Sequence, residues 1–466
     1  MQNSNRNNMK INKFTSALIA LGIVSAASVA QASNPVVYLT GSTAARSIIY
    51  AAATTSGQIF TSGGTVISTG SNNTGSGANT IVYEGNISGV GTVDLDCSFT
   101  GSEAGIAAVA GQTLNQTLSN PPDSNASGSG TSYSLPGVPP SFLNPANWTT
   151  SNASPVPLSS ISGAPANPDL TMADTSQAVS QTSKTTYPLT DYGIVGIVPF
   201  TLMKGYVSGI PDTAWSDVNN ITTAEINQLL AGPLTANFVT GVLGDNGDSI
   251  AVCGRNLGSG TRVNALLNFQ YGINTAVDQF AYNVSYPSGT PGVLTFNGSY
   301  TSPTLTEVFN DGFDSGSGVQ KVLNVDGANQ GVVLIGYLGI SDAAHAHNDD
   351  NTGPGGTGAA SGSGAATYLP FNGVYESDSG VINGSYSYWG QEHLLGSVGQ
   401  SSTGTPGKTA AAIVSGIAAQ LTSSGAGTKT GAVGPTYTAQ SILIPKASMQ
   451  ATRGNDGGFP TQGIFH

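Results

Sequence analysis

Short apolar runs alternate along this chain with segments of helical spacing. Four runs are apolar at nearly every position, as in strands buried on both faces: 36–39, 193–200, 249–253 and 332–338. The spacing of apolar residues predicts helices in four further segments: 47–50, 223–230, 263–269 and 410–421. The alternation predicts an α/β protein whose sheets are mixed, mainly parallel and flanked by helices.

Two polar stretches interrupt this pattern. Residues 113–168 are rich in Ser, Pro, Asn and Gly, and 345–366 has the composition of a Gly-rich loop. Such composition predicts flexible surface insertions without a core of their own.

The first residues have the features of a secretory signal peptide. Basic residues precede the apolar run 17–24, and the small-residue site Ala30-Gln31-Ala32 predicts removal of 1–32 with a cut before Ser33. No cysteine follows the cut, so a lipid anchor at that site is excluded. The later chain has no apolar run near the length of a membrane span. We therefore expect a periplasmic or secreted protein.

The charge balance excludes some partners. The formal net charge of -12 at pH 7 argues against nucleic acid and anionic membranes, since both require a basic face. Anion binding stays open, because the dipoles of a site act over a few ångströms while salt screens distant charges. The chain after the predicted cut is too long for one core and suits two lobes.

The scarce arginines gather at turns. Lys and Arg together number 13 in 466 residues, yet Arg255 and Arg262 flank the turn Gly258-Ser259-Gly260-Thr261. A strand–turn–helix unit aims free N–H groups and the positive end of the helix dipole at one point, where a tetrahedral anion fits. Arginine adds a planar fork of donors. The alternative is an ordinary helix cap by Ser259 or Thr261 beside two solvated arginines.

Similar turns occur elsewhere in a fixed order. The landmarks are Gly41-Ser42-Thr43, Gly101-Ser102, Ala173-Asp174, Ile197-Val198-Pro199-Phe200, Arg255 to Thr261, and Gly336-Tyr337. In this order they resemble the phosphate-binding, type II periplasmic solute-binding proteins of ABC transporters. The resemblance extends over nearly the whole chain after the predicted cut, and the Arg-x-x-Gly-Ser-Gly-Thr turn is its most specific part.

The resemblance implies a two-lobed fold with a hinge crossed twice. Lobe 1 would comprise 33–198 and 374–466, and lobe 2 would comprise 199–373. The implied function is binding of inorganic phosphate, or a similar tetrahedral oxyanion, in the cleft between the lobes. The implied protein is a monomer without cofactor, metal or catalytic activity, and an ABC permease is its implied partner in uptake or scavenging.

The resemblance also implies a set of ligand-binding residues. Donors from one lobe would be Ser42, Thr43 and Ser102, and Asp174 would accept the proton of the phosphate. The implied donors from the other lobe are Arg255, Ser259, Gly260 and Thr261. Arg46 and Arg262 are further candidates, for which pairing with a carboxylate is the alternative.

Other features leave alternatives open. Cys97 and Cys253 form either one disulfide, which the oxidising compartment permits, or two buried free thiols. His345-Ala346-His347 could contact a metal, but a solvated loop is the simpler interpretation. Residues 404–409 imitate a phosphate-binding loop, and a helix start explains them better.

Two rival functions differ from anion binding. A serine hydrolase would need a general base, for which His393 is the candidate, but no Gly-x-Ser-x-Gly turn accompanies it. The other rival is a secreted adhesive or structural protein that reuses the binding-protein fold, as the long polar insertions would allow.

Overall fold

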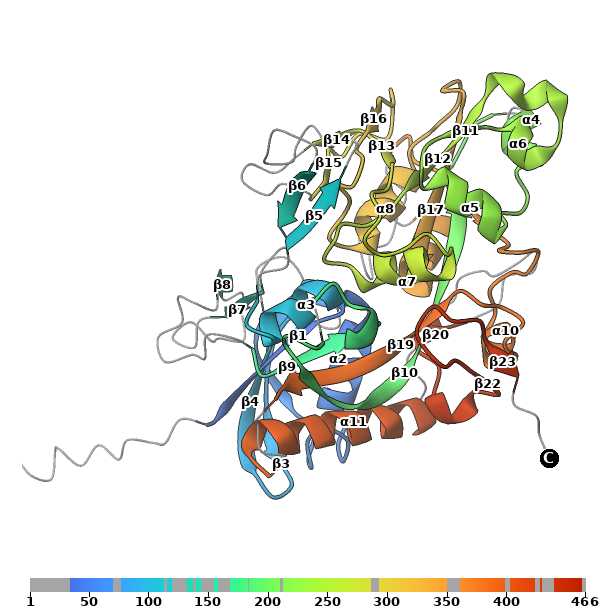
Figure 1. Cartoon of the computed structure of the whole chain (residues 1–466). Helices are drawn as coiled ribbons and strands as arrows, with labels where there is room; N and C mark the ends of the chain where they lie inside the picture. Colours follow the sequence, from blue (N-terminus) through green and yellow to red (C-terminus); the bar gives the residue numbers. More distant parts are fainter. Residues whose placement is uncertain are drawn as a thin grey trace, which may run out of the picture. The chain divides into compact units, whose positions relative to one another are not determined.

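Strands from both ends and from the middle of the chain join in one eleven-stranded sheet (Figure 1). The computed structural model describes residues 34–69, 77–112, 115–119, 132–136, 140–143, 155–157, 168–182, 184–209, 213–285, 293–349, 361–398, 403–423, 428–429 and 440–462. The predicted signal peptide, 1–32, lies outside these residues. The strand order is β11-β12-β17-β10-β19-β9-β1-β4-β3-β2, and β18 also pairs with β10.

The long strand β10 (Leu189–Lys204) joins two halves of this sheet. Its first part, up to Pro199, pairs with β19, and its last part, from Phe200, pairs with β17. The first half contains β1 (Val36–Gly41), β2 (Thr65–Thr69), β3 (Thr80–Ile87), β4 (Gly91–Ser98), β9 (Leu170–Ala173) and β19 (Trp389–Ser397). The second half contains β11 (Leu234–Thr235), β12 (Ser249–Cys253), β17 (Val332–Gly339) and β18 (Thr367–Leu369).

The prediction of an α/β protein with a mixed sheet is confirmed, but its strands are not mainly parallel, because most strand pairs of this sheet are antiparallel. Strand β1 runs parallel to both β4 and β9, and β12 runs parallel to β17. The remaining pairs of the sheet are antiparallel, among them all those of β10 and β3. Strands that are apolar on both faces thus occur in antiparallel pairs as well as in parallel ones. Helices that cover both faces of the sheet bury such strands whatever their direction.

Helices cover the two halves of the sheet. On the first half, α2 (Arg46–Thr54) and α11 (Thr405–Ser423) pack together, and α3 (Ser102–Val109) packs on β1 and β9. On the second half, α8 (Gly316–Leu323) and α9 (Ile340–His347) contact β17, whereas α5 (Thr223–Leu229) contacts β12 and α7 (Gly260–Asn268) contacts β17. Shorter helices are α4 (Thr213–Asp217), α6 (Asn237–Thr240) and α10 (Asp378–Asn383). The four predicted helices are confirmed.

Local signals explain where these helices begin. Helix α5 starts with a capping box, in which the Thr222 side chain accepts from the Glu225 N–H and the Glu225 carboxylate accepts from the Thr222 N–H. Helix α11 begins at Thr405, so the sequence that imitates a phosphate-binding loop is a helix start, as expected.

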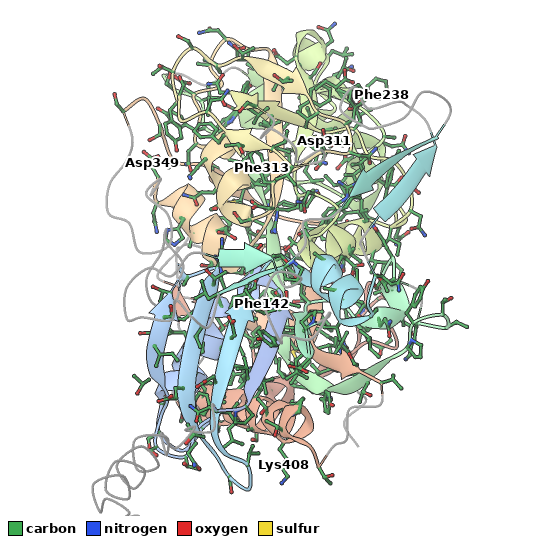
Figure 2. All side chains as sticks on the ribbon, turned by 90° about the vertical axis from the view of Figure 1, so that its left-hand side faces the viewer. Phe142, Phe238, Asp311, Phe313, Asp349 and Lys408 are labelled. Atoms are coloured by element: carbon green, nitrogen blue, oxygen red, sulfur yellow. The ribbon has the colours of Figure 1, made fainter. Side chains whose placement is uncertain are left out.

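The two cysteines lie in different apolar clusters of the core. Cys97 belongs to the cluster under β1 and β4, while Cys253 belongs to the cluster around α8 and β17 that includes Phe313, labelled in Figure 2. Both are buried free thiols. The disulfide alternative is therefore wrong, because each thiol packs against its own set of apolar side chains.

Parts of the predicted insertions have regular structure. Residues 345–347 are the last turn of α9, so the prediction of a loop from 345 is wrong at its start. Between 113 and 168 the described strands form two pairs. Phe142, labelled in Figure 2, packs edge-to-face on Tyr38. The two-stranded sheets are β5 (Asn115–Ser119) with β6 (Ser132–Pro136), β7 (Ser141–Leu143) with β8 (Pro155–Pro157), β13 (Phe280–Tyr282) with β16 (Leu305–Glu307), β14 (Val284–Ser285) with β15 (Thr295–Phe296), β20 (Thr428–Lys429) with β21 (Gln440–Ser441), and β22 (Ala451–Thr452) with β23 (Thr461–Gln462).

The boundaries of the two predicted lobes stay a prediction. Contacts group the chain from Val36 onwards as one unit, and apolar residues of α5 and α7 belong to the same cluster as those of α2 and α11.

Candidate anion-binding site

Three parallel strands end at the same edge of the sheet and carry the first half of the site. The N–H of Ser42, after β1, donates to the Met172 carbonyl of β9 (2.8 Å), and the N–H of Gly101, after β4, donates to the Gly41 carbonyl (2.9 Å). Ligands of open α/β sheets bind outside the carboxyl ends of the strands. The candidate turns at 41–43, 101–102 and 173–174 are therefore neighbours in space.

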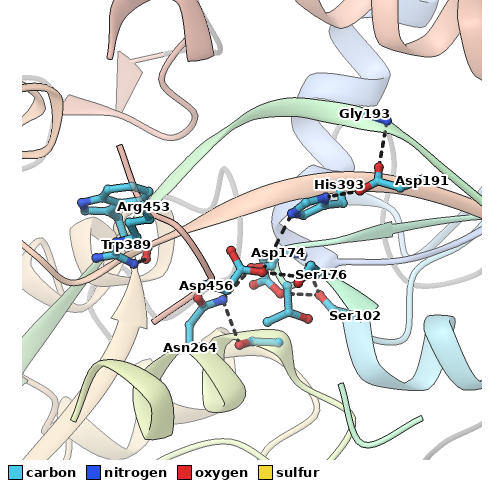
Figure 3. A network of polar contacts seen from close by, with 12 residues as sticks. Ser102, Asp174, Ser176, Asp191, Gly193, Asn264, Trp389, His393, Arg453 and Asp456 are labelled. Carbon is cyan, nitrogen blue, oxygen red and sulfur yellow. Dashed lines mark hydrogen bonds and ion pairs between the residues drawn. The ribbon is translucent and has the colours of Figure 1, made fainter. Parts of the chain in front are cut away.

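Asp174 and Ser102 form the central contact of this region (Figure 3). The Ser102 hydroxyl donates to Asp174 Oδ1 at 2.5 Å, and the Asp174 N–H donates to Ser102 Oγ at 3.2 Å. Both residues are buried. The Asn264 amide of α7 donates to the Asp174 carbonyl at 2.7 Å and to the Gly260 carbonyl at 3.2 Å.

Glycines let the turn before α7 approach the first half of the sheet. A Cβ placed on Gly260 would overlap Asp174 Oδ1 and would lie 2.6 Å from Ser102 Oγ. Gly101 has a φ of 118°, and a Cβ there would overlap the Gly258 carbonyl oxygen. That carbonyl accepts from the N–H of Glu103 at 3.1 Å. The start of α3 and the start of α7 thus face each other with no room for side chains on these glycines.

The start of α7 combines a cap with free donors. The Ser259 side chain accepts from the Arg262 N–H at 3.3 Å and caps the helix. The N–H groups of Gly260 and Thr261 are among those that an α-helix leaves without an intrahelical partner. The cap alternative is thus confirmed for Ser259, but its solvated arginines are not, since Arg255 and Arg262 are buried.

Arg255 and Arg262 have different roles in this turn. Arg255 donates from Nε to the Phe313 carbonyl (3.0 Å) and from Nη2 to the Asp314 carbonyl (2.7 Å), and its Nη1 lies 3.4 Å from the Thr261 hydroxyl. Arg262 donates from Nη1 to the carbonyl of Arg255 (3.0 Å) and from Nη1 and Nη2 to Asn310 (2.8 and 3.0 Å). Arg262 therefore holds the turn in shape, and the Arg255 side chain lies beside Thr261.

Arg46 lies at the turn after β1, near Arg255. Its Nε donates to the Thr43 carbonyl at 2.8 Å and its Nη1 donates to the Gly77 carbonyl at 3.2 Å. Burial lowers the pKa of Arg46, Asp342 raises it and Arg255 lowers it further. Arg46 and Arg255 are thus close enough to repel each other, and the carboxylates of Asp342 and Asp314 offset part of this repulsion.

The carboxyl groups of the site titrate above their ordinary range. Burial raises the pKa of Asp174 to about 6, although the Ser102 hydrogen bond and the charge of Arg255 lower it. Burial likewise raises the pKa of Glu103 to about 7, although its carboxylate accepts from Thr175 Oγ1 (3.0 Å), Ser180 Oγ (2.8 Å) and the Gln181 N–H (3.0 Å). Asp174 is therefore mostly an acceptor at neutral pH.

Several polar residues beside Asp174 were not indicated by the sequence. The fold brings three of them near Asp174 from distant segments: Asn264, Glu392 and Asp456. The N–H of Ser176 donates to Asp456 Oδ2 at 2.7 Å. The signal that could have found Asn264 is a polar residue among the apolar residues of the helical segment 263–269.

His393, the candidate base of the hydrolase alternative, contacts carboxylates. Its Nδ1 lies 2.9 Å from Asp191 Oδ2, and its Nε2 lies 3.9 Å from Asp456 Oδ2 (Figure 3). His345 and His347 belong to α9, and His347 Nδ1 lies 3.0 Å from the Ala366 carbonyl. Among the described residues, no group of three or more His, Cys, Asp or Glu could hold a metal ion. No helix in the described part of the chain is long and apolar enough to cross a membrane.

Solved structures similar to this chain include phosphate-transport proteins. No family model and no curated protein matches the sequence. A protein of Clostridium perfringens, described as a phosphate ABC transporter substrate-binding protein and solved with bound phosphate, aligns with 82% of this chain and 93% of its own, at 13% identity and a TM-score of 0.38. A protein of Planctomyces limnophilus, described as a possible phosphate binding protein, aligns with 84% and 88%, at 11% identity and a TM-score of 0.35. PstS from Borrelia burgdorferi aligns with 84% and 94%, at 11% identity and a TM-score of 0.31.

The sequence resemblance and these structures name the same class of protein, the phosphate-binding substrate-binding proteins of ABC transporters. At such identities and TM-scores the likeness carries no argument about function.

Proposed function

We propose that this protein binds inorganic phosphate, or a similar tetrahedral oxyanion, where the starts of α3 and α7 face Asp174. The single observation that supports this most is the convergence of Ser102, Asp174 and Gly260 from segments far apart in the chain. Two helix N-termini and the nearby Arg255 supply donors and positive charge, and Asp174 supplies one acceptor. A hydrogen phosphate ion offers three oxygens to the donors and one proton to the acceptor.

The proposed ligand contacts come from both halves of the sheet. They are the side chains of Ser42, Thr43, Ser102, Asp174, Arg255, Ser259 and Thr261 with the N–H of Gly260. Arg46, near Arg255, would add charge from the first half. Arg262 is proposed to hold the turn rather than the anion, since its donors are bonded to the carbonyl of Arg255 and to Asn310.

The role in the cell follows from the proposed ligand. We propose a non-enzymatic, extracytoplasmic solute-binding protein that collects the anion for an ABC permease, acts as a monomer and has two lobes closing around the anion. The mixed α/β fold supports the general class of this proposal, a solute-binding protein.

Asp174 should decide the selectivity of the site. An ionised carboxylate can only accept hydrogen bonds. Hydrogen phosphate has a proton to donate, whereas sulfate at neutral pH has none, so sulfate would place a lone pair against Asp174. Selectivity of this kind comes from the repulsive contact as much as from the attractive ones.

Calorimetric titration with phosphate and with sulfate tests the proposal. The protein should bind phosphate and ignore sulfate at neutral pH, and Asp174→Asn should bind sulfate because the amide can donate. Charge-assisted hydrogen bonds contribute roughly 1.5–3 kcal/mol each, so the variant should lose about tenfold or more in phosphate affinity.

Asp326→Asn is the matched control. Its carboxylate accepts two backbone hydrogen bonds, from Ser208 (2.9 Å) and Ala328 (3.0 Å), and the substitution should not affect the binding of either anion. A titration with phosphate that produces no heat of binding would contradict the proposed function and favour the adhesive or structural alternative. Sulfate that binds the unaltered protein as tightly as phosphate would remove Asp174 from the site.

A further inference from the structure

A second buried carboxyl group lies beside Asp174. Glu392 belongs to β19 and is 1% exposed. Both of its carboxyl oxygens are buried without a hydrogen bond of ordinary geometry among the described residues, although the Ser42 hydroxyl lies near enough to lower its pKa. A buried charge without a full set of partners is costly, so the burial of Glu392 calls for a reason.

The strand register places Glu392 opposite Asp174. Strand β19 is antiparallel to β9, with His393 opposite Ala173 and Leu394 opposite Met172. Continued by one residue past the end of β9, the same register sets Glu392 directly across from Asp174. Directly opposite residues share a face of the sheet and have Cβ atoms about 4.5–5.5 Å apart. Two carboxylates at that separation cannot both be ionised easily.

The electrostatics agree with this register. Burial raises the pKa of Glu392 well above its ordinary range, and the charge of Asp174 raises it further. Other titratable groups interact with Asp174 from the elements around it: Arg255 before α7, Asp456 of the C-terminal segment, Glu103 of α3 and Tyr388 before β19. His393, next to Glu392 in β19, contacts Asp191 and Asp456. Arg255 is the cation among the groups interacting with Asp174, so the acidic pair is only partly compensated.

We propose that Glu392 is a specificity-determining residue of the oxyanion site, where it forms with Asp174 a carboxyl pair that holds a proton and takes up a further one when an anion that has no proton binds. This inference rests on the proposed function and deepens it. In the binding step a proton moves from solvent to the pair, and no other bond is made or broken. The pair therefore favours anions at low pH and provides a donor, once protonated, to an anion that has no proton.

The direction of the pH dependence follows from the charges. A bound anion makes the site more negative, which strengthens proton binding to the pair. By linkage, affinity for the anion must rise as pH falls, by at most about tenfold per pH unit for one proton. Sulfate is the sharper probe, because its own protonation does not change across this range, so its dependence reports the protein alone.

The experiment is calorimetric titration with sulfate and with phosphate from about pH 8 to about pH 5, where a raised carboxyl pKa is expressed. Repeating each titration in buffers of different ionisation enthalpy gives the number of protons taken up. The unaltered protein should gain sulfate affinity as the pH falls, by about tenfold per unit at the steepest point. Glu392→Gln should take up clearly less than one proton, because the second carboxyl group of the pair is gone.

Glu376→Gln is the matched control. Glu376 is also 1% exposed, both of its oxygens also lack an ordinary hydrogen bond among the described residues, and burial raises its pKa to about 8. Its charged neighbour is Asp378, so this variant should show the proton uptake of the unaltered protein.

The outcomes separate this inference from the proposed function. If both proteins bind phosphate and Glu392→Gln takes up as many protons with sulfate as the unaltered protein, the role of Glu392 is overturned and the function stands. Absence of phosphate binding at every pH overturns both.

A measurement on the unaltered protein covers the case in which Glu392→Gln does not fold. Infrared difference spectra with and without sulfate should show a gain in the band of protonated carboxyl groups near pH 6, where Asp174 is partly ionised before the anion binds. Spectra without that gain overturn the inference.

Discussion

The substitution Gly260→Ala tests whether the start of α7 lies against Asp174. The added Cβ would overlap Asp174 Oδ1 and would lie 2.6 Å from Ser102 Oγ, where ordinary contact begins at 3.4 Å. The serine oxygen must therefore retreat by 3.4 − 2.6 = 0.8 Å, and the aspartate oxygen by more. Because both side chains are buried and bonded to each other, neither can move freely.

Two effects of Gly260→Ala oppose each other. Replacing glycine in a helix by alanine stabilises the protein by roughly 0.4–1 kcal/mol through the unfolded chain. Overpacking a buried site costs about 1–3 kcal/mol. The net expectation is a loss of about 1–2 kcal/mol, a factor of roughly 5–30 in an equilibrium constant. Thermal unfolding should report the loss of stability, and phosphate titration should report a loss of affinity of similar size.

The control lies two residues away in the same turn. A Cβ on Gly258 would find its nearest atoms at 3.5 Å, the Cβ of Ala104 and Oδ1 of Asn256, which is ordinary contact. Gly258→Ala should therefore change stability by no more than about 0.5 kcal/mol. If Gly260→Ala had the unfolding temperature and the phosphate affinity of the unaltered protein, the packing of α7 on Asp174 would be refuted.

Three further predictions concern other parts of the chain. Arg255→Lys keeps the charge but loses the planar fork that donates to Phe313 and Asp314, so phosphate affinity should fall about tenfold or more; an unchanged titration would place the anion elsewhere. The intact mass should not change on reduction, because Cys97 and Cys253 are free thiols. In the native protein both should resist thiol reagents, because burial raises the pKa of each thiol, and rapid labelling of either would contradict this. The pKa of Glu376, about 8, lies above its unfolded value, so the folded state holds an extra proton. Stability should therefore fall as the pH rises from about 4.5 to about 8, by up to about 1.4 kcal/mol per pH unit. Melting curves of Glu376→Gln should show a smaller dependence of stability on pH, and an identical dependence would contradict the assignment.

The sequence by itself determined the local units of this protein. The apolar run 249–253, the turn that follows and the helical spacing of 263–269 predicted β12 and α7, and the structure agrees within a few residues. Such units depend on neighbouring residues alone: backbone sterics, apolar spacing and capping act within one or two turns of chain. The amino-acid pattern around Gly260 is therefore enough to predict the N-terminal donors of this helix.

Only the tertiary structure decided how these units meet. Strand β19 comes from near the C-terminus and inserts between β9 and β10, which sets Glu392 opposite Asp174 across more than two hundred residues. The same packing bonds Arg262 to the carbonyl of Arg255 and leaves Cys97 and Cys253 in separate cores. Strand order and direction are set by the burial of the whole apolar surface. A local pattern carries no information on which distant strand becomes its neighbour.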